Sequence, residues 1–141
     1  MKVELNRMND AVHFEAVGTG NIKVQIDGSP EIGGLGLGVR PMEMILMALA
    51  SCSSLDLVSI LKKQRQVIEK FSVAVDGKRR EQIPTIFTHI HLLFKLTGTL
   101  DAPKVAKAAE LAVKKYCSVH DMLVAGGVNI TYSIEINGNV I

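Results

Sequence analysis

The two cysteines are the residues of this chain whose settings could do chemistry. Cys52 lies in an apolar run predicted to be a helix from residue 41 to about residue 63, and Cys117 follows 65 residues later in KKYCSVHDML. A cysteine can be a small buried hydrophobic group, or it can react as a thiolate. Two cysteines can also form one dithiol/disulfide couple. The residues around them must distinguish these interpretations.

The surroundings of Cys52 disfavour a thiolate. The residue stands about three turns into the predicted helix, beyond the first turn where the helix dipole acts. Burial opposes charge on a thiol, and Asp56, one turn further on, opposes it as well. A nucleophilic Cys52 therefore needs a cation from elsewhere in the fold, for which the candidates are Arg7, Arg40, Arg79 and Arg80.

The surroundings of Cys117 favour a thiolate. Ser118 and Asp121 have the S-x-x-D spacing of a helix start, which would place Cys117 just outside the positive end of a short helix. Three further groups nearby in sequence favour the charged form, namely Lys114, Lys115 and His120. The same segment can also be a simple helix cap with a surface histidine.

Other motifs indicate little chemistry. The GGLGLG run lacks the G-K-[ST] of a phosphate-binding loop and predicts a mobile loop. His89 and His91 would share one face of a strand without a third ligand, and Cys52, Cys117 and His120 make a poor zinc pattern, so no metal or cofactor is expected. Glu43 is either a buried acid that needs a partner or a first-turn acid favoured by the helix dipole.

Length and composition favour one domain over residues 1–141. A net charge of +2 and the absence of Trp argue against a nucleic-acid partner. The start MKVELNRMND lacks the apolar core of a signal peptide, so a cytoplasmic location with reduced thiols is expected. Residues 42–61 contain Glu43 and Asp56, which favours a buried helix over a membrane span.

Periodicity predicts an α+β fold in the order β-β-β-α-β-β-α-β. Asp101 is predicted to cap the second helix, and REQIP is predicted to connect two long strands as a hairpin. The expected strands are VELNR, AVHFEAVG, NIKVQID, FSVAVDGKR, TIFTHIHLLFKLTG and GVNITYSIEING.

The first predicted helix is apolar nearly all round in its N-terminal half. A helix without a solvated face is buried on every side. A domain of this size seldom surrounds such a helix alone, so a homodimer built over it is expected.

The stretch RPMEMILMALASC, the later KKYCSVHDML and the segment KRREQIPTIFTHIH together resemble the OsmC/Ohr superfamily, and within it the YhfA-like branch. The resemblance covers essentially the whole chain. It implies an intertwined homodimer around long central helices, with two sites at the subunit interface. It also implies thiol-dependent reduction of organic hydroperoxides in oxidative or osmotic stress defence.

On that template Cys52 attacks the peroxide and Cys117 resolves the sulfenic acid as a disulfide, which a dithiol such as a dihydrolipoyl group reduces. The well-studied branch has glutamate directly after the proline, where this chain has Met42, and an arginine near residues 17–21, where this chain has none. Glu43 is nine residues from Cys52, on the opposite side of a straight helix. Glu43 and Arg40 are the candidate partners of Cys52. The alternative is a non-peroxidatic protein that binds a small apolar ligand or senses redox state.

Overall fold

A computed structural model describes residues 1–141. Contacts within the chain divide it into two units, Met1–Ile45 and Leu46–Ile141. The mixed α+β class predicted from the sequence is confirmed, with two sheets and three helices.

The first unit contains a three-stranded antiparallel sheet in the order β1-β2-β3. Short 3-10 turns, η1 (Thr19–Asn21) and η2 (Pro30–Ile32), follow β2 and β3. Apolar side chains of this unit remain exposed in the single chain, among them Ile22 at 70% and Leu35 at 68%. The three strands are β1 (Glu4–Arg7), β2 (Phe14–Val17) and β3 (Lys23–Ile26).

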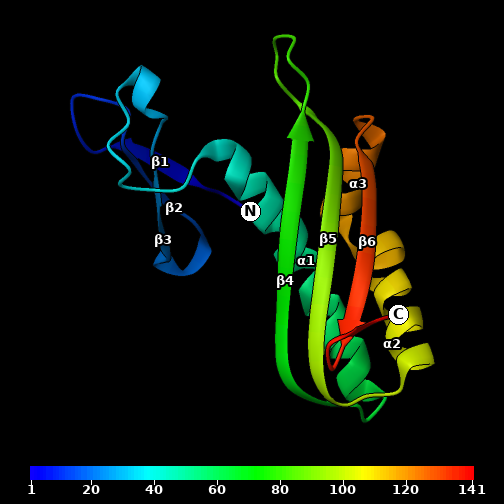
Figure 1. The fold of residues 1–141 in the computed structure, drawn as a ribbon. Coiled ribbons are helices and arrows are strands. Elements are labelled where there is room, and N and C mark those ends of the chain that lie inside the picture. The colour runs from blue at the N-terminus through cyan, green and yellow to red at the C-terminus, as the bar shows by residue number, and fades with distance from the viewer. The chain divides into compact units, whose positions relative to one another are not determined.

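The second unit contains a sheet in the order β4-β5-β6-β7 (Figure 1). The long strands β4 (Val67–Arg79) and β5 (Phe87–Thr99) form the predicted antiparallel hairpin. Strand β6 (Asn129–Ile136) pairs parallel to β5, and the short β7 (Asn139–Val140), which the sequence did not predict, pairs antiparallel to β6.

The parallel pairing of β5 with β6 requires a crossover, which the helical segment between them provides. Helix α2 (Ala102–Leu111) begins at Asp101, whose carboxylate accepts the Lys104 N–H at 2.9 Å, as the sequence predicted. It continues as a π-helical turn, η3 (Ala112–Tyr116), and α3 (Ser118–Ala125) then leads to β6. Figure 1 shows α1 and α2 behind the sheet.

Helix α1 (Pro41–Lys63) has the bounds expected from its apolar run, its N-terminal proline and its terminal lysines. Its buried residues recur every four positions, which forms a stripe along one side, namely Leu49, Ser53, Leu57 and Leu61. The single chain does not cover the other side, where Met47 is 51% and Leu55 is 74% exposed.

Helix α1 is also the one helix long and apolar enough to cross a membrane by length and composition alone, and 22% of its most apolar 18 residues are buried. Core helices of soluble proteins meet the same criteria.

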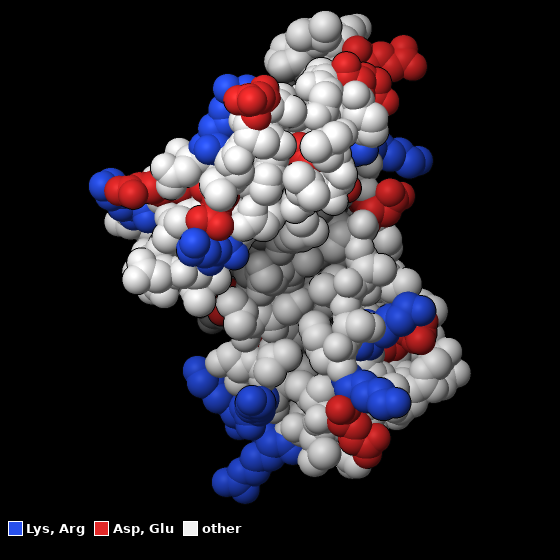
Figure 2. Space-filling view, turned by 90° about the vertical axis from the view of Figure 1, so that its left-hand side faces the viewer, with Lys and Arg blue, Asp and Glu red and all other residues white.

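Charged side chains of both signs occur on the face shown in Figure 2, with broad uncharged areas between them.

Candidate functional site

The fold brings the two cysteines into contact. Cys52 lies about three turns into α1, beside the buried stripe, and is half-buried. Cys117 lies between η3 and α3 and is only 1% exposed. Both are free thiols, and Cys52 lies close enough to Cys117 to raise the pKa of its thiol. Residues 65 positions apart in sequence therefore form a dithiol pair.

Cys117 itself is the N-cap of α3. Its backbone is extended (φ −72°, ψ 99°), and its Sγ accepts the amide N–H of His120 at 3.3 Å. The sequence pattern had placed the cap at Ser118, one residue too late. The extended dihedrals at Cys117 are the reason, because a cap residue is non-helical while the helix begins at the next residue.

The structure corrects the expected acidity of Cys117. Burial raises the pKa of its thiol, and the neighbouring Cys52 raises it further. The Ser53 hydroxyl and the His120 N–H act in the opposite direction but do not outweigh burial. The predicted preference for thiolate is therefore wrong for the resting pair.

The lysines before Cys117 approach aromatic rings. Lys114 Nζ stands 6.0 Å from the ring centroid of Tyr132, and Lys115 Nζ stands 5.5 Å from that of Tyr116. These separations fall in the range of cation–π contacts. Closeness in sequence thus overstated what the lysines contribute to the acidity of Cys117.

Ser53 is the functional candidate that the sequence did not indicate. It is fully buried and lies near the Cys117 thiol, whose pKa it lowers, yet its Oγ has no hydrogen-bond partner. The hydroxyl of Ser51, by contrast, donates to the carbonyl of Met47 at 2.7 Å. A serine beside a cysteine carries no motif, so only the packing identifies Ser53.

Glu43 has a local partner at the start of α1. Its Oε2 accepts the backbone N–H of Arg40 at 2.9 Å, and its side chain is exposed. This is the reciprocal half of a capping box, in which an acid at the third helical position satisfies the N–H of the cap residue. The structure thus gives Glu43 the role of a first-turn acid, and a role of Glu43 and Arg40 in catalysis stays a prediction.

The other candidate arginines bind nearby loops. Arg79 donates to the carbonyl and hydroxyl of Thr85, and Arg80 donates to the carbonyl of Pro84, so both secure the β4–β5 turn. Arg7 donates to backbone carbonyls of the turn after β1. The cation expected beside Cys52 stays a prediction.

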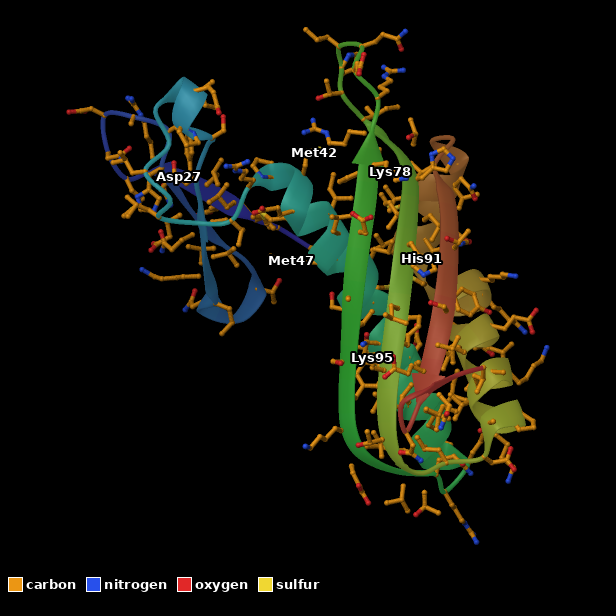
Figure 3. All side chains as sticks on the ribbon, viewed as in Figure 1. Asp27, Met42, Met47, Lys78, His91 and Lys95 are labelled. Carbon is orange, nitrogen blue, oxygen red and sulfur yellow. The ribbon has the colours of Figure 1, made fainter.

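The histidines of β5 lie on the outer face of the second sheet, in a hollow of about 310 Å³ that also includes Asp76 and Lys78 (Figure 3). His91 directs Nδ1 to the hydroxyl of Thr131 at 2.8 Å and Nε2 to that of Ser133 at 2.9 Å. Both ring nitrogens are thus occupied by hydroxyl groups, and no group of three metal-ligating side chains occurs in the chain.

The glycine-rich loop, predicted to be mobile, is anchored by the buried Asp27. Its carboxylate accepts the N–H groups of Gly28 at 2.8 Å, Leu35 at 2.9 Å and Leu37 at 3.0 Å. The Leu37 N–H contributes most to holding the pKa of Asp27 below its usual range, although burial opposes this. An Asp before a Gly-Ser-Pro turn was the available signal.

Comparisons with known proteins agree with this architecture. A family model described as OsmC-like protein matches residues 34–133. Protein YhfA of Escherichia coli strain K12 is 50% identical over 97 residues, which make up 68% of this chain and 72% of that protein. A hypothetical protein from Aquifex aeolicus VF5 is 28% identical, with a TM-score of 0.80 over 96% of both chains.

The fold is also shared with a protein described as an organic hydroperoxide resistance protein OsmC, predicted redox protein, regulator of sulfide bond formation, from Legionella pneumophila. That structure is 20% identical, with a TM-score of 0.64, and covers 96% of this chain and 97% of its own.

Proposed function

This chain belongs to the OsmC-like family, and on that premise we propose that it reduces organic hydroperoxides through a sulfenate/disulfide cycle of Cys52 and Cys117. The observation that carries the proposal is the contact between two free thiols that come from distant parts of the sequence. The substrate class follows from relatives of the same fold described as organic hydroperoxide resistance proteins.

The different accessibility of the two cysteines supports giving them different roles. Cys52 is half-buried, whereas Cys117 is 1% exposed, so a peroxide reaches Cys52 more readily. The Cys52 thiolate attacks the peroxide oxygen, the O–O bond breaks, and the departing alkoxide takes a proton to become an alcohol. Cys52 is then a sulfenic acid, oxidised by two electrons.

The second step uses the neighbouring thiol. The Cys117 thiolate attacks the sulfenic sulfur of Cys52, the S–O bond breaks, and the hydroxide leaves as water after taking a proton. The S–S bond that forms requires the two α-carbons to lie within about 7 Å of each other. The closeness of the two thiols favours this separation. A dithiol reductant, such as a dihydrolipoyl group, returns the pair to two thiols and is itself oxidised to a disulfide.

We further propose that the working protein is a homodimer over α1. Its uncovered side presents Met47 and Leu55, and exposed apolar surface of this kind marks an interaction site. A second copy would cover the same residues in a two-fold arrangement.

The raised pKa of Cys117 favours one alternative, a redox sensor whose thiols react slowly. Stopped-flow mixing of the reduced protein with cumene hydroperoxide separates the two. We expect rapid loss of both thiols in the natural protein, no reaction in Cys52→Ser, and one equivalent consumed in Cys117→Ser, with a dimedone adduct at Cys52. If the natural protein keeps both thiols under these conditions, the peroxidase proposal fails and the sensor account replaces it.

A further inference from the structure

We propose that Ser53 is a catalytic residue of the disulfide-forming step, whose hydroxyl donates a hydrogen bond to Sγ of Cys117 when that sulfur becomes a thiolate. The inference rests on the proposed dithiol cycle and deepens it, because it identifies what prepares the resolving thiol. Neither the family match nor the sequence pattern assigns a role to this serine.

The first observation is an unused donor. Ser53 is 0% exposed, and its Oγ has no hydrogen-bond partner. A helical serine can satisfy its hydroxyl on the carbonyl one turn earlier, as Ser51 does with Met47. Ser53 does not do so, although an unsatisfied buried hydroxyl costs stability. A buried donor left unpaired needs an explanation, and an acceptor that forms during the reaction supplies one.

The second observation is where that donor lies. Ser53 directly follows Cys52 in α1. Its hydroxyl lies near the thiol of Cys117 and lowers the pKa of that thiol. Sulfur in a neutral thiol is a weak acceptor, whereas a thiolate accepts strongly. The contact therefore strengthens when the proton leaves Cys117.

Two donors then converge on one sulfur. The His120 N–H already donates to Sγ of Cys117 at 3.3 Å from the start of α3, and the Ser53 hydroxyl, on α1, lies near the same sulfur without a partner in the resting protein. Burial opposes the thiolate at this position, so hydrogen bonds to the charged form are the means by which a buried resolving cysteine can ionise. In the step itself the hydroxyl stays intact, while the Cys117 thiolate attacks the Cys52 sulfenic acid and water leaves.

The test uses Ser53→Ala and, as a matched control, Ser54→Ala. Ser54 is the adjacent helical serine, and its hydroxyl is likewise buried without a partner. Unlike Ser53, it is not among the groups that shift the pKa of the Cys117 thiol. Thermal unfolding of both variants checks that the fold is kept.

The first measurement needs no peroxide. In a Cys52→Ala background, the rate of Cys117 alkylation by iodoacetamide is followed against pH. We expect Ser53→Ala to move the midpoint of this profile to higher pH, because a donor to the thiolate is lost, and Ser54→Ala to leave it in place. If the two variants give the same midpoint, the proposal is overturned, whether or not the protein reduces peroxides.

The second measurement follows single-turnover oxidation in the two-cysteine protein. With one equivalent of cumene hydroperoxide, Ser53→Ala should form the sulfenic acid at the natural rate and convert it to the disulfide about tenfold more slowly. A normal second step would overturn the catalytic role even if the alkylation midpoint moved. Should the peroxide fail to oxidise the natural protein at all, the proposed function fails, and the alkylation profile still decides whether Ser53 serves the Cys117 thiolate.

Discussion

The amide N–H of His120 lies 3.3 Å from Sγ of Cys117, so the buried thiol that contacts Cys52 is also the N-cap of α3. One sulfur atom therefore serves two purposes, since it starts a helix and faces the partner thiol. A change in the charge or bonding of the Cys117 sulfur therefore alters the hydrogen bond that caps the first turn of α3.

Oxidation should join Cys52 to Cys117 within one chain. Their side chains lie close together in the reduced protein, which favours a bond within one chain once one sulfur is oxidised. Diamide treatment followed by non-reducing digestion and mass spectrometry should recover one disulfide-linked peptide pair and no free thiol. Linkage between two subunits only, shown by a doubled mass in denaturant, would contradict the resolving role of Cys117.

The stability of the reduced protein should fall at alkaline pH because of Cys117. Burial first, and Cys52 second, raise the pKa of this thiol in the folded chain. The folded state thus holds the proton more tightly than the unfolded state, where the pKa is about 8.5. The stabilisation is complete below that value and is lost as the pH rises through the higher pKa of the folded state.

Urea unfolding of the reduced protein and of Cys117→Ala between pH 7 and 10 measures this loss. The free energy of unfolding should fall more steeply with pH in the natural protein than in Cys117→Ala. Tyr132, whose pKa is also raised mainly by burial, is present in both and cancels in the comparison. Parallel curves would show that the thiol has the same acidity in both states.

The uncovered side of α1 should hold two chains together. Sedimentation at low micromolar concentration should give one species of twice the 15.3 kDa chain mass. Leu55→Glu places a charge on the exposed apolar side of α1. Because the change occurs in both subunits, it should raise the dissociation constant of the dimer by at least about a hundredfold. Lys62→Glu, an exposed change near the end of the same helix, is the control. A natural protein that sediments as a monomer would exclude the dimer.

Asp27→Asn should release the glycine-rich loop. The carboxylate accepts three backbone N–H groups, and an amide nitrogen at one of its two positions would instead face a donor. Amide hydrogen exchange at Leu35 and Leu37 should become faster, while Asp10→Asn, a change at an exposed acid, should leave it unaltered.

The pH dependence of the same exchange follows from the lowered pKa of Asp27, which the Leu37 N–H causes most strongly. Protection should be complete above the unfolded value of about 3.9 and should be lost as the pH falls through the lower pKa of the folded state. Equal exchange in Asp27→Asn and the natural protein would mean that other contacts hold the loop.

The sequence alone determined the two longer helices and most strands, because their signals are local. The apolar run from Pro41 to Lys63 and the Asp101 cap each specify an element within a few residues. Alternation along β4 and β5 specified the hairpin for the same reason. The family was also recognisable, since RPMEMILMALASC, KKYCSVHDML and KRREQIPTIFTHIH are local motifs.

Tertiary structure alone decided the chemistry of the pair. Sequence neighbours made Cys117 look acidic, but burial is a long-range property, and it reversed the direction of the pKa change. The unpaired hydroxyl of Ser53 and the three N–H groups on Asp27 depend on backbone geometry that no local pattern encodes. Local propensity thus fixes where elements begin and end, whereas packing between them decides which polar atoms lose water and which partners replace it.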